Sequence, residues 1–315
     1  MQALNVPAEG EQPQLSEVPK PKVTGGTVLI RVKASGLNPM DNAIATGMVT
    51  QMMQHLYPVT LGRDAAGVVE AVGEGVEHVA VGDEVFGHVL FAPPIQAGTL
   101  AEYALLPATA VAAKPSGLDF VTAAALPLSG AAAAQVTEAI DPQPGQSVLI
   151  NGASGGVGSF AIQLLAGRGA TVIATGTADD IDRLTSLGAH TVVDYSAGPI
   201  VEELKGTYPD GVDALVNLAG FTAAEVPFQA VRKGGRVSTT TGAPDEETLS
   251  GAGLTGSTIV AMPVRETTLP LSEQAAAGRL KVDVTTVLPL QRATEGLATI
   301  ASGKARGKIV VKVSD

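Results

Sequence analysis

The stretch that decides the fold is Val148-Leu149-Ile150-Asn151-Gly152-Ala153-Ser154-Gly155-Gly156-Val157-Gly158. An apolar strand, predicted over 147–151, enters a turn of small residues, and a helix is predicted over 157–168. Small residues let the backbone approach a pyrophosphate, and the exposed N–H groups at the start of the helix attract that anion. The last glycine of the run lets the helix lie close to the strand. We therefore predict that residues 152–158 bind a dinucleotide.

The run is a variant of the G-x-G-x-x-G fingerprint, because Ala153 stands at its first position. A tight strand–helix turn without a ligand is the alternative. A second strand, predicted over 170–175, favours the dinucleotide. We expect Gly155 to need the space of a glycine, and a valine there to be forced into a left-handed backbone.

The end of the second strand decides which dinucleotide is bound. Gly176 leaves room for a 2′-phosphate, and Thr175 and Thr177 offer hydroxyl donors. No carboxylate follows until positions 179 and 180, whose acids suit a helix start. Arg183 is a candidate phosphate contact, with a solvated helix-face arginine as the alternative. The pattern favours NADP(H).

The pattern of predicted elements differs between two parts of the chain. Residues 1–115 hold short strands between Gly, Pro and Asp residues, which is typical of an irregular barrel. From about 120 to 263, apolar strands alternate with helices, as in a parallel sheet covered on both faces. The strands predicted there are 147–151, 170–175, 191–195, 214–218, 235–240 and 257–262. We expect one domain over 121–263 and a second over 1–120 with 264–315.

Composition excludes several classes of protein. The chain has 31 acidic and 20 basic residues, so its net charge of −11 gives no basic footprint for nucleic acid. The absence of Cys excludes disulfides, Cys-ligated zinc, iron–sulfur clusters and a thiol nucleophile. The first twenty residues are polar and Pro-rich, unlike a signal peptide, and no apolar stretch suits a membrane span. We expect a cytoplasmic protein, and an apolar sheet edge near 257–262 suggests a homodimer.

The chain resembles the zinc-free quinone oxidoreductases of the medium-chain dehydrogenase/reductase superfamily, the group that includes zeta-crystallin. The likeness covers nearly the whole length. Besides the phosphate loop, the matching segments are 28–41, 61–73, 81–87, 98–103, 187–189, 194–195 and 307–310. The resemblance implies an α/β fold with a doubly wound Rossmann domain and an irregular GroES-like β-barrel domain.

The resemblance also indicates whether the chain has the residues that bind a catalytic zinc ion. In the zinc alcohol dehydrogenases a Cys occupies the place of Asn38, and a His-Glu pair occupies the places of Arg63 and Asp64. None of the four histidines, at 55, 78, 88 and 190, forms a ligand-like pair with a neighbouring acid. We therefore expect no metal.

By the same resemblance, Asn38 and Asp41 lie near the nicotinamide. The amide of Asn38 is then a donor to a carbonyl oxygen, and Arg63 stabilises developing negative charge. Water, Tyr57 or an unidentified side chain supplies the proton. The alternatives are a turn and helix start at residues 38–41 and a buried structural pair of Arg63 with Asp64.

We expect further cofactor contacts at Tyr195, Asn217, Thr240 and Met262. Two features depart from the family pattern. Gly130-Ala131-Ala132-Ala133 stands where the family has Gly-x-Thr-Ala, and Asp180 stands where the family has a basic residue.

The function that the resemblance implies is NADPH-dependent hydride transfer to a quinone or an α,β-unsaturated carbonyl compound, with a small apolar substrate. The alternatives are an enoyl reductase of polyketide or fatty-acyl metabolism and a crystallin-like protein that binds NADPH without turnover.

Overall fold

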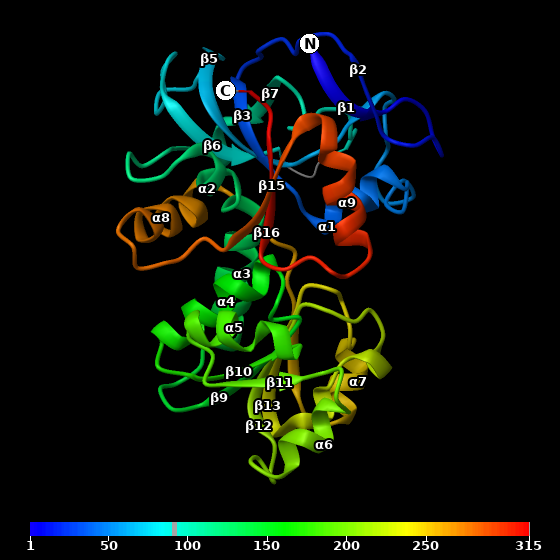
Figure 1. Ribbon diagram of the computed structural model, residues 1–315, viewed down its shortest axis with the longest axis vertical. Coiled ribbons are helices and arrows are strands. Elements are labelled where there is room, and N and C mark those ends of the chain that lie inside the picture. Colours follow the sequence, from blue (N-terminus) through cyan, green and yellow to red (C-terminus); the bar gives the residue numbers. More distant parts are fainter. Residues whose placement is uncertain (90–92, 315) are drawn as a thin grey trace. The chain divides into compact units, whose positions relative to one another are not determined.

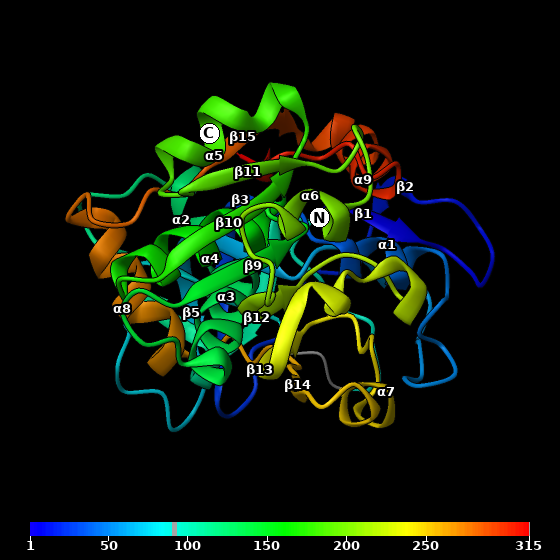
Figure 2. The same ribbon diagram turned by 90° about the horizontal axis from the view of Figure 1, so that it is seen from below.

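Strand β9 (Ser147–Asn151) is buried at every position and lies inside a six-stranded parallel sheet. The computed structural model describes residues 1–89 and 93–314. The other strands of this sheet are β10 (Thr171–Gly176), β11 (Thr191–Asp194), β12 (Val212–Asn217), β13 (Val231–Thr239) and β14 (Thr255–Thr258). Their order is β11-β10-β9-β12-β13-β14 (Figure 2). Counted from β9, this is the 3-2-1-4-5-6 order of a Rossmann sheet, so the predicted fold class is confirmed.

The sheet belongs to a unit of residues Ala132–Ala261. Its helices are α4 (Gly156–Gly167), α5 (Ile181–Ser186), α6 (Ile200–Lys205) and α7 (Glu246–Gly251). Leu149, Ile173 and Leu215 are fully buried within its core. A Cβ at Gly158 would lie only 2.4 Å from the carbonyl oxygen of Ala153. The glycine therefore permits the close approach of α4 to the turn after β9, as predicted.

The last strand differs from the prediction over 257–262. β14 reads Thr255-Gly256-Ser257-Thr258, is exposed at all four positions and pairs with β13 at the edge of the sheet. Its pairing ends at Thr258, opposite Thr239. The apolar residues that suggested a strand follow it, and Val260 is 80% exposed. The edge strand itself is therefore polar, not apolar.

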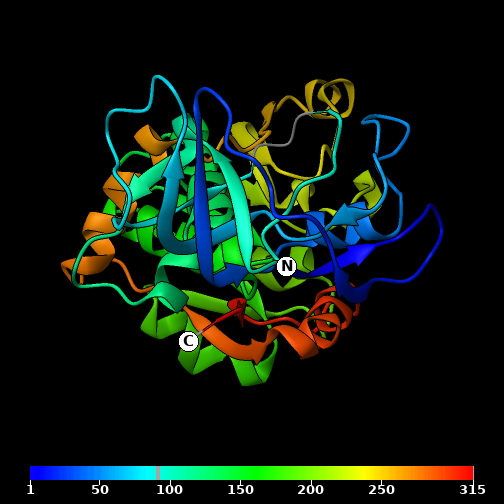
Figure 3. The same ribbon diagram turned by 90° about the horizontal axis from the view of Figure 1, so that it is seen from above.

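The other unit comprises Met1–Ala131 and Met262–Asp315. Its larger sheet follows the order β15-β16-β3-β5-β6-β8, and β7 also pairs with β3. These strands are β3 (Thr27–Gly36), β5 (Asp64–Val72), β6 (Glu84–His88), β7 (Tyr103–Pro107), β8 (Val111–Ala113), β15 (Val284–Pro289) and β16 (Lys308–Lys312). Figure 3 draws the strands of this sheet from the N-terminal part of the chain in blue and cyan. All of its pairings are antiparallel except β15 with β16. Buried valine, isoleucine, leucine and alanine side chains fill its interior.

The same unit has a small sheet at the N-terminus. It contains β1 (Gln2–Val6), β2 (Gln14–Glu17) and β4 (Val59–Thr60), in the order β2-β1-β4 (Figure 1). The helices of the unit are α1 (Pro39–Ala45), α2 (Phe120–Ala124), α8 (Arg265–Ala276) and α9 (Ala293–Ala301). Helix α3 (Pro127–Ile140) begins in this unit and ends in the other. Among the described residues, no helix has both the length and the apolar character of a membrane span.

Candidate functional site

The phosphate loop follows β9 directly. Gly152 has a left-handed backbone (φ +83°), and its N–H donates to Oγ1 of Thr175 at 3.0 Å. Gly155 is the N-cap of α4, and no side chain caps the N–H groups of the first turn. Those groups need acceptors, and the helix dipole favours an anion there. The loop therefore fits the pyrophosphate of a dinucleotide.

Two glycines of the loop, Gly152 and Gly155, differ in backbone conformation, and the difference is not the one expected. The backbone of Gly155 is extended (φ −81°), and a Cβ there would meet only the carbonyl oxygen of Gly152, at 3.6 Å. The expectation of a left-handed backbone at Gly155 is wrong. Gly152 is the left-handed residue, and its Cβ would lie 3.0 Å from Cβ of Ala219. A side chain at Gly155 therefore would not strain the turn.

The end of β10 is already bonded within the protein. Thr175 is 1% exposed and accepts the N–H of Gly152. The hydroxyl of Thr177 donates to Oδ2 of Asp180 at 3.0 Å. Nη2 of Arg183 donates to Oδ1 of Asp180 at 2.8 Å and to the Ser154 carbonyl at 3.0 Å. Asp180 also accepts the N–H of Thr177 at 3.1 Å, so it takes part in the helix start that the sequence predicted, and the guanidinium of Arg183 pairs with it.

The remaining predicted cofactor residues occupy different surroundings. Asn217 is fully buried; it accepts from Nδ2 of Asn151 and donates to the Ala243 carbonyl, both at 2.9 Å. It joins the carboxyl ends of β9 and β12 to the loop after β13, so it positions the sheet edge. Tyr195 is 45% exposed, Thr240 is partly exposed, and Met262 is 51% exposed and belongs to the other unit.

A buried polar cluster in the unit of residues 1–131 and 262–315 contains Asn38. Nδ2 of Asn38 donates to Oδ2 of Asp64 at 2.9 Å and to the Gly36 carbonyl at 3.4 Å. Oδ1 of Asn38 accepts from Nζ of Lys308 at 2.7 Å and from Oγ of Ser129 at 3.5 Å. Asn38 is 2% exposed, and both amide hydrogens are engaged. The structure therefore does not leave the Asn38 amide free for a substrate carbonyl, contrary to expectation.

Asp64 pairs with a histidine and not with Arg63. Oδ1 of Asp64 lies 2.6 Å from Nδ1 of His88 and accepts the N–H of Leu128 at 3.1 Å. Nζ of Lys308 lies 3.8 Å from its Oδ2. Neighbouring residues in the sequence gave no sign of this pair, because it is β5 and β6 that set residues 64 and 88 opposite each other. An Arg63–Asp64 structural pair is not formed.

Asp41 lies in the first turn of helix α1, which begins at Pro39 after the N-cap Asn38. Its Oδ2 accepts the N–H of Asn38 at 2.8 Å, which is the helix-start arrangement. Its Oδ1 is buried and has no hydrogen-bond partner among the described residues. Burial raises the pKa of Asp41 to about 7, while the Asn38 hydrogen bond and the charge of Arg63 oppose the shift. The carboxyl thus changes protonation near neutral pH.

Arg63 is anchored by one end only. Its Nη1 donates to the Ala97 carbonyl at 3.1 Å, while Nε and Nη2 have no partner among the described residues. The residue is 1% exposed. Burial lowers the pKa of Arg63, and the charge of Asp41 opposes this.

Tyr57 lies beside a shallow cavity of about 310 Å³. The cavity is lined by Glu9, Thr50, Gln51, Gln54, His55 and Tyr57. The hydroxyl of Tyr57 lies 3.5 Å from Nδ1 of His55. Burial, followed by the charge of Glu9, raises the pKa of Tyr57, so its hydroxyl is a weaker acid than usual.

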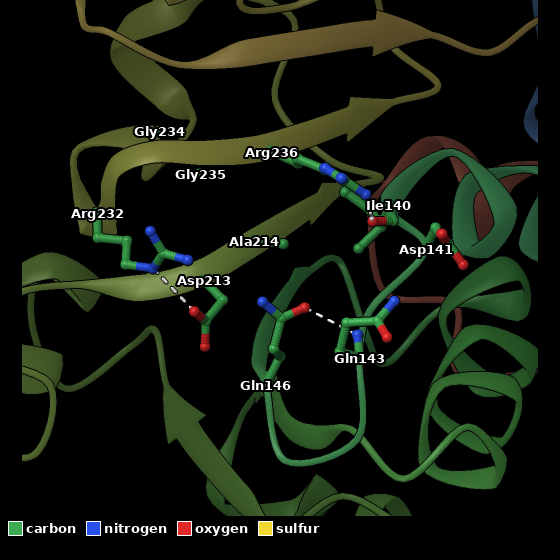
Figure 4. Close-up of a pocket in the computed structure, with 10 residues that line it drawn as sticks. All are labelled: Ile140, Asp141, Gln143, Gln146, Asp213, Ala214, Arg232, Gly234, Gly235 and Arg236. Carbon is green, nitrogen blue, oxygen red and sulfur yellow. Dashed lines mark hydrogen bonds and ion pairs between the residues drawn. The ribbon is translucent and has the colours of Figure 1, made fainter.

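A second cavity, of about 150 Å³, lies at the amino ends of the strands of the Rossmann sheet (Figure 4). It is lined by residues at the amino ends of β9, β12 and β13, including an ion pair between Arg232 and Asp213 at 2.8 Å. The phosphate loop follows the carboxyl end of β9, where dinucleotides bind in such sheets. This cavity is therefore separate from the predicted cofactor site, and none of the predicted residues lines it.

Sequence reasoning missed Lys308, Ser129 and His88. Lys308 is fully buried at the start of β16, next to three buried apolar residues. A lysine beside such a run was the available signal, because lysine is almost never buried without partners. Ser129 and His88 gave no local signal, since their partners are distant in sequence.

Comparison with known proteins finds two family models. Residues 24–116 match the alcohol dehydrogenase GroES-like domain, and residues 187–311 match the zinc-binding dehydrogenase domain. The chain is 32% identical to the quinone oxidoreductase of Sus scrofa, over 94% of this chain and 92% of that protein. It is 32% identical to the chloroplastic NADPH-dependent alkenal/one oxidoreductase of Arabidopsis thaliana, over 94% and 74%. The solved quinone oxidoreductase of Coxiella burnetii superimposes with a TM-score of 0.90 at 26% identity, covering 100% and 99%.

The name of the second family model raises the question of zinc. Among residues 1–89 and 93–314, no group of three or more His, Asp or Glu side chains is placed to hold a metal ion. At the positions resembling zinc ligands stand the amide of Asn38, the cation of Arg63 and the carboxylate of Asp64. The last of these is already bonded to His88 and Asn38. These residues do not fit a zinc ion.

Proposed function

Because the chain belongs to the quinone oxidoreductase family of the medium-chain dehydrogenase/reductase superfamily, we propose that it is an NADPH-dependent reductase of quinones or α,β-unsaturated carbonyl compounds. One structural observation carries the proposal. The uncapped first turn of α4 follows a Gly-rich turn at the carboxyl end of the central strand β9. That arrangement receives the pyrophosphate of a dinucleotide.

Residues 152–158 hold the pyrophosphate in this proposal, through backbone N–H groups and the helix dipole. Residues near 175–183 surround the adenosine ribose. When bound, NADPH supplies a hydride, and the protein supplies orientation and electrostatics. We propose that NADPH binds more tightly than NADH because Arg183 lies at the strand end, where a 2′-phosphate is accommodated. Fluorescence titration with both cofactors tests this order, and tighter binding of NADH would assign Asp180 to the ribose hydroxyls instead.

The substrate is proposed to be a neutral, apolar carbonyl compound. The experiment is NADPH consumption measured over a panel of quinones, enones and enoyl thioesters. Turnover with quinones or enones is the expected result. Preferred turnover of enoyl thioesters would assign the chain to acyl metabolism, and tight NADPH binding without any turnover would indicate a binding protein.

We further propose a homodimer in the cytoplasm. The exposed edge strand β14, followed by the exposed Val260, supports pairing across a two-fold axis. Light scattering at micromolar concentration tests the dimer, and a monomer would refute it. Fractionation of the source cells tests the location, which stays a prediction because one relative is named chloroplastic.

A further inference from the structure

Several buried polar atoms without a hydrogen-bond partner lie in the unit of residues 1–131 and 262–315. The described residues contain six buried side-chain polar atoms without a hydrogen-bond partner. Four of them are Oδ1 of Asp41, Nε2 of His55, and Nε and Nη2 of Arg63. Arg63 directly precedes Asp64, whose Oδ2 accepts from Asn38, and the N–H of Asn38 donates to Asp41, so Arg63 and Asp41 belong to one buried cluster. The charge of Arg63 also reaches His55. Leaving a buried charged donor unpaired costs more than a typical hydrogen bond contributes, so this arrangement requires an acceptor.

The free atoms of Arg63 form a fork. Nε–H and the adjacent Nη2–H lie along one edge of the planar guanidinium and point in nearly the same direction. Nη1 is held by the Ala97 carbonyl, so the free edge has a fixed orientation. These two N–H groups can donate to one oxygen placed between them or to two oxygens side by side.

Asp41 supplies a proton in the same buried cluster. Because Oδ2 accepts the N–H of Asn38, the proton of the neutral carboxyl resides on Oδ1. Among the described residues, no hydrogen bond or ion pair joins Asp41 to Arg63 directly. Both residues therefore present unpartnered polar atoms, a guanidinium edge on Arg63 and a carboxyl oxygen on Asp41.

The charge at the cavity beside Tyr57 bears on the kind of substrate. His55 lines that cavity, and its buried Nε2 faces no protein partner among the described residues. Glu9 also lines the cavity. Burial and then the charge of Arg63 lower the pKa of His55, and the charge of Glu9 opposes this; burial and then the charge of Glu9 raise the pKa of Tyr57. A negative charge at this cavity disfavours an anionic substrate. An oxygen acceptor for Arg63 is therefore better supplied by a neutral carbonyl than by a carboxylate.

We propose that Arg63 and Asp41 together bind the carbonyl oxygen of the substrate, and that Asp41 is the proton donor of the reduction. The inference rests on the proposed function. Hydride addition to the β-carbon of an α,β-unsaturated ketone moves the C=C π pair into a new C=C bond next to the carbonyl carbon. The carbonyl π pair moves onto oxygen. Arg63 stabilises that oxyanion, the O–H bond of Asp41 breaks, and the proton forms a new bond to the oxygen.

The product of this step is an enol, which becomes the saturated ketone in solution, and oxidised NADP⁺. The two electrons come from the nicotinamide, and the proton comes from Asp41. Asp41 remains as a carboxylate beside Arg63 and is reprotonated from water. In a quinone the same oxygen becomes a hydroquinone hydroxyl.

Several charged groups face Asp41 and enter its pH dependence. Arg63 and Lys308 favour the carboxylate, and Asp64 opposes it. His88 is bonded to Asp64, and the charge of Arg63 also reaches His55. Since burial outweighs these charges, Asp41 keeps its proton up to about pH 7. We expect kcat of the parent enzyme to fall as pH rises through 7.

The first test is Asp41→Asn, which preserves an acceptor for the Asn38 N–H and removes the acid. We expect kcat to fall about 100-fold, KM to change less than about threefold, and the fall of kcat above pH 7 to disappear. The control is Asp213→Asn, which makes the same change at a hydrogen-bonded carboxylate of the other unit. It is expected to alter stability without altering the pH profile. A parent-like kcat and pH profile in folded Asp41→Asn would overturn the assignment of the proton donor.

The second test is independent of turnover. 4-Nitrophenol, an analogue of the enolate, is titrated into the protein with NADP⁺ present, and its absorbance reports the phenolate. We expect the parent to bind the phenolate and to lower the pKa of the bound phenol. Arg63→Gln should weaken binding at least tenfold, and Arg63→Lys should recover only part of it. Equal binding by folded Arg63→Gln and parent would mean that the free guanidinium edge holds only water.

The two proposals fail in different ways. A parent that oxidises NADPH with no member of the substrate panel contradicts the proposed function, whereas the nitrophenol titration still tests the oxygen site. If Asp41→Asn does not fold, that titration decides the Arg63 part, and Asp41→Glu, which keeps the acid, tests the proton donor through its pH profile. Loss of the fall above pH 7 in folded Asp41→Glu would contradict the assignment.

Discussion

The ammonium of Lys308 lies 2.7 Å from Oδ1 of Asn38, although 270 positions separate the two residues. Lys308 also donates to the Leu37 carbonyl at 3.0 Å and to Oγ of Ser129 at 3.1 Å. All three ammonium hydrogens therefore have acceptors, which makes the burial of the lysine tolerable. The contact holds the start of β16 against the segment between β3 and α1, and it fixes Asn38, whose N–H donates to Asp41.

Lys308→Met should destabilise the protein strongly. The change leaves Oδ1 of Asn38 and the Leu37 carbonyl short of a donor and leaves Asp64 with less compensating charge. Removing one partner of a buried ionic group costs about 3–5 kcal/mol. Urea unfolding measures the loss. The matched control is Lys312→Met, at the exposed end of the same strand, which should stay within about 0.5 kcal/mol of the parent. Equal midpoints for the two variants would contradict the role of Lys308.

Asp41 should make the folded protein less stable as pH rises from about 4 to 7. Its pKa is raised from 3.8 to about 7, so between these values only the folded state holds the proton. The free energy of unfolding then falls with pH, by up to about 1.4 kcal/mol per pH unit. Asp41→Asn should remove this part of the slope. Denaturant unfolding of both proteins from pH 4 to 8 provides the measurement, and parallel curves would contradict it.

Gly155→Val should abolish NADPH binding while leaving the fold intact. The backbone at Gly155 is extended and its Cβ has room, so we expect a stability change within about 1 kcal/mol. A side chain at this N-cap would occupy the pyrophosphate space and weaken binding at least 100-fold. Gly167→Val, at the other end of α4 with open space around it, is the control. Gly152→Val should instead unfold the turn, because its backbone is left-handed. Parent-like NADPH titration of Gly155→Val would refute the phosphate loop.

Activity should survive exhaustive chelation. Asn38 and Arg63 stand where zinc ligands stand in related alcohol dehydrogenases, and Asp64 is bonded to His88. Dialysis against a strong chelator, followed by elemental analysis and a rate measurement, gives the test. Stoichiometric zinc that is lost together with activity would show the prediction to be wrong.

Local patterns predicted the Rossmann unit well. The strand over 147–151 has the predicted bounds, and the helix after it begins one residue earlier than predicted. Both depend on contiguous residues: a run of buried apolar side chains, then glycines. The end of β10 was predicted less well. The threonines were expected to be free donors, but Asp180 reaches back to Thr177 and Arg183 reaches across to Ser154.

The buried polar cluster around Asn38 could not be predicted from local sequence patterns, because its residues are distant in the sequence. Strand pairing sets Asp64 opposite His88, and the return of the chain at β16 brings Lys308 to Asn38. The small sheet of β1 and β2 was also missed, because its residues lie among prolines and polar residues. Asn38, Asp41 and Arg63 were nevertheless identified as a group, through the resemblance and not through spacing. Their roles as site residues stay predictions.

The most direct test of the central claim is hydride transfer from NADPH to an enone. The protein is incubated with NADPH that carries deuterium at both C4 positions of the nicotinamide and with an α,β-unsaturated ketone, and the product is analysed by mass spectrometry and NMR. The account predicts a saturated ketone that carries one deuterium, at the β-carbon, with one NADP⁺ formed for each product molecule. A product without deuterium at the β-carbon would contradict it.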